Sequence, residues 1–596
     1  MNNMNLNFQV NLQGIIDLLS NHLYSDPGVF VRELLQNGVD AVTARKRLGH
    51  QTEGKVSVEL FPSSHTISFM DNGIGLTQTE IEQFLARIGS TTKQADQDSA
   101  DDFIGQFGVG LLSCFVMSDE IVLITRSALE GDSLEWRGKP DGTYVINKLQ
   151  RTVPIGTTVF LKMKPEYEEY AEWYKMYELL ERYGKYLETP IVLTEDKDSR
   201  LINDSTPPWR MDKPEAIAYI EDSEYDKPMD IIPLKSLIGE VEGIAYILPY
   251  AVSLQEEKRH KVYLKRVLLS DKMTNILPSW AFFVNGIINT NSLRPTASRE
   301  SFQENDLFYL VRDELGACIK QYLMDLASAN PDLFHRMVII HYASLKTMAA
   351  EDEELYELFI RHLSFETSYG DMKMGDILRE HKTIMVTSTF DEFRQVARVA
   401  KAQGMMVING GYVHDLDLVR KLPTVDENVQ VSVLDILSFS SRFESLKQSE
   451  RDEVQPFLML SDQLLANYQC QTLIKWFEPA DIPVLFNINQ EVNFFKMMEE
   501  SEKEANPLFA EVVHVIKDEL YEKPYARLCF NYNNPIVRKA IASGDAKLQR
   551  TCIELLYTQA LLMGNHPLSG HELRLMNDSL LEFMNMGLDR NAEASR

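Results

Sequence analysis

The chain of 596 residues lacks the features of membrane and secreted proteins. No run of about eighteen apolar residues occurs, so a membrane-spanning helix is not expected. The N-terminal segment has neither a basic start nor a long apolar core, which argues against a secretory signal. The five cysteines are scattered and form no Cys-x-x-Cys pair: Cys114, Cys318, Cys470, Cys529 and Cys552. These absences predict a cytoplasmic protein that keeps its thiols reduced.

Positive charge is also scarce. The chain has 60 Lys and Arg against 88 Asp and Glu, which gives a formal net charge of −28. Such a charge repels polyphosphate surfaces over any distance that salt leaves unscreened. The composition therefore disfavours a dedicated nucleic-acid or anionic-membrane binder, while it is compatible with a small bound nucleotide.

Low-complexity blocks and short-period repeats are absent, which indicates a globular chain. Its length exceeds what one hydrophobic core organises, so several domains are expected. The polar, proline-bearing segment "EDKDSRLINDSTPPWRMDKPEAI" is typical of a boundary between domains. We predict three domains, at residues 1–195, 205–478 and 480–596.

The pattern of apolar residues predicts a multidomain α+β protein. Two helices are expected before residue 50, broken at "YSDPG", followed by the strands "KVSVELF", "TISFM", "EIVLITR" and "TTVFLKM". This mixture predicts a sandwich with helices on one face of one sheet. The middle region alternates strands such as "HKVYLKRVLLS" and "WAFFVNGIINT" with a largely helical stretch from Asp306 to Leu378. The last hundred or so residues are predicted to be helical.

Two amphipathic helices are expected near the C-terminus. Apolar residues recur at helical spacing in the first of them: Ile553, Leu556, Tyr557, Ala560 and Leu561. A capping box from Ser569 to Glu572 opens the second, which is expected to end at Gly587. Their apolar stripes either pack within their own domain or form a dimer interface.

Polar residues form a stripe on the predicted helix "VRELLQNGVDAVTARK". Glu33, Asn37 and Asp40 stand at positions i, i+4 and i+7, so at about 100° per residue they share one side of the helix. On its own such a stripe is typical of a helix face in contact with water. Only the motifs that follow give it another meaning.

Three glycine- or threonine-bearing motifs follow in order. In "DNGIG", Asp71 leaves a strand and enters a turn where Gly75 permits close backbone approach, and its carboxylate can accept a hydrogen bond from an exocyclic amine. In "GQFGVG", glycines before a helix can expose backbone N–H donors to phosphate, although no Gly-Lys-Ser/Thr follows as in a P-loop. In "GTTV", Thr157 precedes a strand with its hydroxyl available to the same ligand.

Together these motifs resemble the four nucleotide-binding boxes of the GHKL ATPase superfamily, which DNA gyrase, heat shock protein 90 chaperones, sensor histidine kinases and MutL repair proteins share. "LYSDPGVFVRELLQNGVDA" and "IGQFGVGLLS" are similar to the heat shock protein 90 family in particular. "LPSWAFFVNGIINTNSL" and "ASRESFQEN" resemble its middle domain, and "ELLYTQALLMG" resembles its C-terminal domain. The resemblance implies a Bergerat-type ATPase sandwich, an α/β middle domain and a helix-rich dimerisation domain.

The resemblance implies a role for each motif residue. Glu33 would act as general base in ATP hydrolysis, and Asn37 would hold Mg2+. Asp71 would accept the adenine amino hydrogen. The remaining nucleotide contacts that it implies are Asp40, Gly75, Lys93, Gly108, Val109, Gly110, Leu111 and Thr157. From the middle domain, Arg299 would contact the terminal phosphate with Gln303 beside it, because a guanidinium fork suits developing oxygen charge.

The implied function is that of an ATP-dependent molecular chaperone. Its partners would be partly folded client proteins and a second copy of the chain, joined through the C-terminal domain, with neither nucleic acid nor membrane. Phe84 stands near the position of a family asparagine, so the polar contact to ribose or base is not expected there. No long charged linker and no acidic C-terminal pentapeptide occur, as in bacterial-type members. A MutL-like repair protein, with the same boxes and a similar length, is the nearest alternative.

Overall fold

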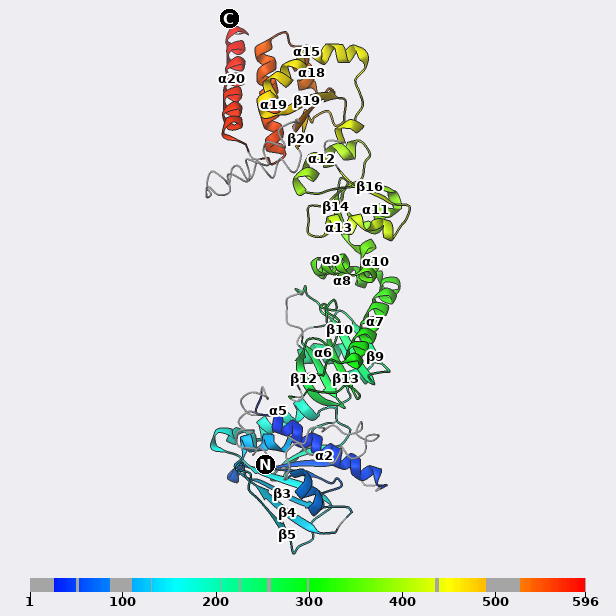
Figure 1. Cartoon of the computed structure of the whole chain (residues 1–596), viewed down its shortest axis with the longest axis vertical. Coiled ribbons are helices and arrows are strands. Elements are labelled where there is room, and N and C mark those ends of the chain that lie inside the picture. The colour runs from blue at the N-terminus through cyan, green and yellow to red at the C-terminus, as the bar shows by residue number, and fades with distance from the viewer. Residues whose placement is uncertain are drawn as a thin grey trace, which may run out of the picture. The chain divides into compact units, whose positions relative to one another are not determined.

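The computed structural model describes twelve parts of the chain: residues 26–49, 53–85, 110–129, 131–203, 205–224, 227–253, 259–296, 298, 300–434, 439–488, 526–566 and 568–594. These parts belong to two compact units, residues 1–341 and 342–596 (Figure 1). Among the described helices, none combines the length and apolar character needed to cross a bilayer. The chain is a multidomain α+β protein, as predicted.

The first unit begins with an eight-stranded sheet, in the order β5-β4-β3-β6-β2-β1-β7-β8. Its strands are β1 (Val56–Phe61), β2 (Thr66–Asp71), β3 (Ile121–Arg126), β4 (Ser133–Gly138), β5 (Tyr144–Lys148), β6 (Gly156–Lys162), β7 (Ile191–Glu195) and β8 (Asp198–Leu201). Only β1 and β7 pair in parallel; the other neighbours are antiparallel. Buried and half-buried residues alternate along β3, because its β-branched and apolar side chains face the core at every second position.

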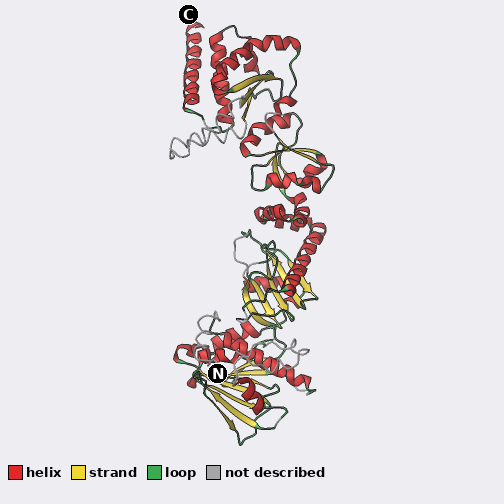
Figure 2. Ribbon diagram, viewed as in Figure 1, coloured by secondary structure: helices red, strands yellow, loops and turns green. Residues whose placement is uncertain are grey.

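Helices α2 (Val29–Arg47) and α5 (Trp173–Gly184) pack on one face of this sheet (Figure 2). Leu35 of α2 and Leu180 of α5 are both fully buried in the core that they share with the strands. Short helical segments follow β2 and precede β3: α3 (Gln78–Glu80), a π-helical turn (Ile81–Leu85), a 3-10 turn (Gly110–Ser113) and α4 (Cys114–Met117).

A second, five-stranded sheet of the first unit has the order β12-β11-β13-β10-β9. Its strands are β9 (Ile231–Ser236), β10 (Val241–Ile247), β11 (His260–Leu264), β12 (Val267–Met273) and β13 (Val284–Thr290). The same part of the chain contains the helices α6 (Lys213–Glu224), α7 (Asp306–Ala329) and α8 (Pro331–Ile340). The aromatic rings of Tyr186, Trp209 and Tyr263 meet at centroid distances of 5.1 to 5.7 Å. One hydrophobic core therefore runs from the first sheet into the second.

The second unit contains two smaller sheets. The first has the order β15-β14-β17-β16-β18 and the second the order β19-β21-β20. Around the first lie α9 (Tyr342–Glu351), α10 (Glu353–Phe359), β14 (Ser364–Thr367), β15 (Gly370–Lys373), α11 (Met374–Glu380), β16 (Thr383–Thr387), α12 (Phe390–Ala402), β17 (Val407–Asn409), α13 (Asp415–Arg420) and β18 (Gln430–Val433). Around the second lie α15 (Gln448–Leu465), β19 (Cys470–Lys475), β20 (Val484–Ile488), β21 (Ala526–Asn531), α18 (Pro535–Ala542), α19 (Ala546–Met563) and α20 (Gly570–Ala594).

Most predicted elements occur where the sequence pattern placed them. The helix from Val29, the four strands of the first sheet and the capping box at Ser569 are all confirmed. The helix predicted before "YSDPG" lies outside the described residues. The three-domain division with boundaries at 195–205 and 478–480 stays a prediction.

The structure adds one strand and corrects two local predictions. The added strand is β8, in the polar segment after residue 195, which pairs with β7 at the edge of the first sheet. "HKVYLKRVLLS" is a hairpin rather than one strand, because Lys265 and Arg266 adopt left-handed backbone conformations that turn the chain. Helix α20 continues through Gly587 to Ala594, since an isolated glycine lowers helix stability without ending the helix.

Leu161 tests how the first sheet is stabilised. It is fully buried on β6, so Leu161→Ala should lower the free energy of unfolding by about 2–5 kcal/mol through lost burial and the cavity left behind. The exposed neighbour on the same strand supplies a control, and Lys162→Ala should change stability by less than about 0.5 kcal/mol. Guanidinium unfolding followed by tryptophan fluorescence measures both variants. Equal effects of the two substitutions would contradict the burial assigned to Leu161.

Candidate functional site

A row of polar side chains crosses three neighbouring strands of the first sheet. Asp71 at the end of β2 lies opposite Thr157 on β6, which in turn lies opposite Thr125 on β3. Residues in register on one face have their side chains about 5 Å apart, so the three form a continuous line. The hydroxyl oxygens of Thr125 and Thr157 are 3.0 Å apart. The sequence placed Asp71 and Thr157 at one site, and the strand register brings them together.

Glycines let the backbone close tightly around Asp71. The N–H of Gly73 donates to Asp71 Oδ1 at 2.8 Å. A side chain at Gly156 would collide with the Asp71 carbonyl oxygen, since its Cβ would lie 2.1 Å away. Gly75 has a φ of +71°, and a Cβ there would lie 2.1 Å from the carbonyl oxygen of Arg126. Any other residue at Gly75 or Gly156 would push these strands apart.

Helix α2 passes close to Asp71, which stands at one end of the polar row. A Cβ at Gly38 would lie 3.5 Å from Asp71 Cβ, so the helix approaches the sheet closely at this point. Further along, the N–H of Ile74 donates to the carbonyl of Ala41 at 3.0 Å and ties the "DNGIG" turn to the helix. Of the three stripe residues, Glu33 and Asp40 are buried, whereas Asn37 is exposed. A water-facing stripe would expose all three, so the stripe is not an ordinary surface face.

Glu33 is held between its own neighbour and the "GQFGVG" segment. Its side chain is 2% exposed, and its Oε1 lies 3.6 Å from an Arg32 guanidinium nitrogen. A Cβ at Gly110 would lie 2.3 Å from Glu33 Oε2, so only glycine leaves room for this carboxylate. The Cys114 thiol lies close by, and its pKa is raised by burial and by the negative charge of Glu33. The structure thus brings Glu33 and Gly110 together.

Arg32 links Glu33 to the loop that follows β13. Its guanidinium donates to the carbonyl oxygen of Ser298 at 3.3 Å. This loop is closed by a bridge between Pro295 and Phe302, and the amide of Gln303 donates to the Pro295 carbonyl at 3.0 Å. Gln303 is exposed and engaged within its own loop. The loop that carries Gln303 therefore contacts α2 one residue away from Glu33.

Several predicted site residues lie outside the described residues. They are Lys93, Gly108, Val109 and Arg299. The side chain of Phe84 is likewise not described. Leu111 is described, and it is half-buried against the core of the first sheet.

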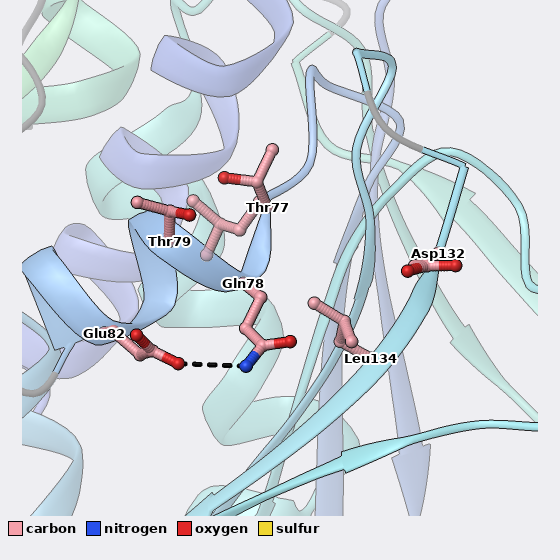
Figure 3. Close-up of a pocket in the computed structure, with 7 residues that line it drawn as sticks. Thr77, Gln78, Thr79, Glu82, Asp132 and Leu134 are labelled. Atoms are coloured by element: carbon pink, nitrogen blue, oxygen red, sulfur yellow. Dashed lines mark hydrogen bonds between the residues drawn. The ribbon is translucent and has the colours of Figure 1, made fainter.

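A separate hollow of about 260 Å3 adjoins the "DNGIG" turn (Figure 3). It is lined by Leu76, Thr77, Gln78, Thr79, Glu82, Asp132 and Leu134. Gln78 spans part of it and donates to Glu82 at 2.9 Å. Leu134 lies opposite Thr125 in the sheet, so the hollow sits at the end of the polar row. Its lining includes none of the site residues that were predicted in the described part of the chain.

The environment of Asp71 changes its proton affinity. Burial raises the pKa of this carboxyl to about 7, against the smaller lowering effects of the Gly73 and Thr157 backbone N–H groups and of the Arg45 charge. Removing a carboxylate from water disfavours its charged form more than these partners favour it. A carboxyl poised near neutrality at the end of a strand is a common property of binding and catalytic sites.

Two family models match this chain. Residues 24–150 match the model described as "Histidine kinase-, DNA gyrase B-, and HSP90-like ATPase", and residues 249–380 match the model "Hsp90 protein". The first spans α2, Asp71 and Thr125 and ends before Thr157, and the second spans β11 to α11. Each of the two matched regions is thus similar to a part of heat shock protein 90 chaperones.

Curated proteins to which this chain is similar are named "Chaperone protein HtpG". The relative from Chlorobium luteolum is 27% identical over 405 residues, which are 61% of this chain and 63% of the relative. That from Legionella pneumophila (strain Paris) is 28% identical over 394 residues, 59% of each chain. That from Salinispora arenicola is 24% identical over 426 residues, 63% of this chain and 66% of the relative. The similarity thus spans about three fifths of the relatives' length.

Two residues of the site were not predicted from the sequence. Arg32 precedes Glu33 within the same motif. Consecutive side chains on a helix point about 100° apart, so the sequence gave no reason to expect a contact between these two side chains. Thr125 lies in the predicted strand "EIVLITR", and its position beside Thr157 depends on strand register. The alternation of apolar residues in the two predicted strands was the signal that could have found Thr125. An antiparallel pairing that matched their buried positions would have placed Thr125 opposite Thr157.

The raised pKa of Asp71 predicts a pH-dependent stability difference. In the unfolded chain the carboxyl loses its proton near pH 4, while in the folded protein it keeps the proton up to about pH 7. This group therefore stabilises the fold most below pH 4, and its contribution is lost as the pH rises towards 7. Asp71→Asn removes that contribution and keeps the size of the side chain.

Wild type should accordingly gain stability over Asp71→Asn as the pH falls from 7 to 5. The difference in the free energy of unfolding should grow by less than about 1.4 kcal/mol for each pH unit. The side chain is partly exposed, and solvent screening reduces the effect. Denaturant unfolding of both proteins at matched pH measures the difference. A difference that is constant from pH 5 to pH 8 would show that Asp71 has an ordinary pKa.

Proposed function

We propose that this chain is an ATP-dependent molecular chaperone that couples ATP hydrolysis to the binding of partly folded proteins. The observation that carries the proposal is the close approach of α2 to Asp71. The helix carries a buried carboxylate, Glu33, and an exposed amide, Asn37, and it passes beside the end of β2, where Asp71 pairs with Thr157. The family models over residues 24–150 and 249–380 support the same reading.

Each end of the proposed site has its own task. Asp71 and Thr157 bind the adenine amino group, while Gly110 and the neighbouring backbone of the "GQFGVG" segment bind phosphate. The exposed amide of Asn37 suits Mg2+, because its neutral oxygen is a hard ligand and the metal takes its other ligands from phosphate and water. When bound, Mg2+ neutralises phosphate charge.

Glu33 is proposed as the general base. The carboxylate lies in a site that excludes most solvent, and it can take a proton from water beside the terminal phosphate. The guanidinium of Arg32 competes for that carboxylate and also binds the Ser298 carbonyl. A shift of the 294–303 loop would therefore change the partner of Arg32, release Glu33 and bring the predicted Arg299 and Gln303 towards phosphate.

Helix α20 is proposed to join two copies of the chain. It lies alongside α19 in Figure 1, and its buried residues Glu572 and Ser579 face that helix. The opposite side exposes an apolar stripe in which each side chain is about half exposed: Leu573, Leu580, Leu581, Met584 and Leu588. An unpaired stripe of this length in water is unfavourable, and a second copy of the same helix would bury it symmetrically.

Glu33→Gln separates binding from hydrolysis. The substitution keeps the shape of the side chain and removes the base, so the affinity for ATP should stay within about threefold while turnover falls by about 100-fold or more. Calorimetry and a steady-state phosphate-release assay measure the two quantities. Glu168→Gln, at an exposed residue on the same unit, should leave both unchanged. Hydrolysis by Glu33→Gln at the wild-type rate would reject the assignment.

The same proteins distinguish a chaperone from a MutL-like repair protein. Wild type should suppress aggregation of a thermally unfolding client more strongly when ATP is present. For Glu33→Gln, which should bind ATP without hydrolysing it, the part of this effect that requires hydrolysis should be absent. A parallel gel-shift assay should detect no ATP-dependent DNA binding, in line with the net charge of −28. ATP-dependent DNA binding without any effect on aggregation would favour the repair function instead.

The α20 stripe predicts the outcome of charge insertion. Leu580→Glu together with Met584→Glu should convert the dimer to monomers, because two carboxylates in a buried apolar contact would lose their hydration. His571→Glu, at an exposed position outside the stripe, should leave the dimer intact. Analytical ultracentrifugation of the full chain measures the oligomeric state. A monomeric wild type, or a dimer that survives the double substitution, would contradict the interface.

A further inference from the structure

Thr125 makes three hydrogen-bond contacts through a single hydroxyl group. The N–H of Leu76 donates to its oxygen at 2.9 Å. The carbonyl oxygen of Gly156 lies 3.0 Å from it, and the hydroxyl oxygen of Thr157 also lies 3.0 Å from it. Thr125 is fully buried, so water does not compete for these contacts. The inner face of the sheet holds this group directly behind Thr157.

The chemistry of the three partners decides where the protons lie. A hydroxyl has one proton to donate and two lone pairs that accept. The Gly156 carbonyl can only accept, so its contact is a hydrogen bond only when Thr125 donates to it. The Leu76 N–H can only donate and takes one lone pair of Thr125. The remaining lone pair is then filled by the proton of Thr157.

The reverse orientation is unfavourable. If Thr125 donated to Thr157, the oxygens of Thr125 and Gly156 would face each other at 3.0 Å without a proton between them. Two buried acceptors at this distance repel, and each would lose a hydrogen bond. The direction of the chain of hydrogen bonds, from Thr157 to Thr125 to Gly156, is therefore set by the sheet and not by the ligand.

We propose that Thr125 is a positioning residue that fixes the Thr157 hydroxyl as a hydrogen-bond acceptor, so that the base end of the site selects a 6-amino purine over a 6-oxo purine. The inference rests on the proposed function, because it requires ATP to bind beside Asp71. With its proton turned towards Thr125, the Thr157 oxygen offers lone pairs, and it stands next to the acceptor carboxylate of Asp71 in the row. Two acceptors suit an amino group and repel a keto oxygen.

The raised pKa of Asp71 makes this second acceptor necessary. A carboxyl with a pKa of about 7 is partly protonated at neutral pH and could then donate to a keto oxygen. Thr157 cannot do so while Thr125 holds its proton. The pair therefore keeps its preference for an amino group at a pH where Asp71 alone would lose part of it.

The test compares ATP with inosine triphosphate, which carries a 6-oxo group in place of the 6-amino group. Thr125→Val keeps the size of the side chain and removes the hydroxyl, which frees the Thr157 proton to turn towards the ligand. The preference for ATP, expressed as the ratio of the two dissociation constants, should fall by about tenfold. Thr125→Ser restores the hydroxyl and should keep the ratio within about threefold of wild type.

Two further measurements separate positioning from a structural role. Thr125→Val should change the dissociation constants more than it changes the turnover of bound ATP, because Thr125 acts at the base end of the site and Glu33 at the phosphate end. In a Thr157→Val background, adding Thr125→Val should change the ratio by less than about twofold, because the acceptor that Thr125 orients is absent. Calorimetry on the full chain with Mg2+ present gives the dissociation constants, and thermal unfolding shows that each variant is folded.

The outcomes distinguish the inference from the proposed function. If wild type binds neither nucleotide, the proposed function fails. If wild type prefers ATP and Thr125→Val leaves the ratio unchanged, or lowers it equally in the Thr157→Val background, the role of Thr125 is overturned while the ATP site stands. Should Thr125→Val fail to fold, Thr157→Val alone decides, since removal of the acceptor must lower the ratio and an unchanged ratio overturns the inference.

Discussion

The close approach of α2 to the first sheet is the contact on which the site depends. Gly38 lets the helix lie close to the first sheet, because a Cβ at this position would be tight against Val56 at 3.1 Å and would already touch Asp71 Cβ at 3.5 Å. The approach places the polar stripe of the helix over the end of β2. It also closes the interior around Glu33, where the carboxylate meets Gly110 rather than water. A looser packing would leave the same residues as an ordinary wet helix face.

Buried charge makes the site responsive to its surroundings. Arg32 and Glu33 are both about 2% exposed, and a pair of charges in such an environment is sensitive to any change in its hydrogen bonds. Arg32 also reaches the loop after β13, which lies more than 260 residues further along the chain. Movement of that loop would thus change the hydrogen bonds of Arg32 and, through Arg32, the surroundings of Glu33.

The polar row adds a second kind of control. Strand register fixes Asp71, Thr157 and Thr125 side by side, and the sheet holds them more rigidly than a loop could. Proton positions within such a row are decided by the backbone carbonyl and N–H groups at its end. Selectivity for a base can therefore be built into a sheet by a residue that does not touch the base.

The sequence by itself determined the fold class, most strands and helices, and the motif residues Glu33, Asp71 and Thr157, because periodicity and turn chemistry are local properties. The order of the motifs also indicated the resemblance to heat shock protein 90 chaperones, to which two regions of the chain are similar. Only the tertiary structure decided that Glu33 is buried beside Arg32, that Thr125 stands behind Thr157, and that β8 belongs to the first sheet. These facts depend on strand register and helix packing, which join residues far apart in the chain, and no local pattern encodes such pairings.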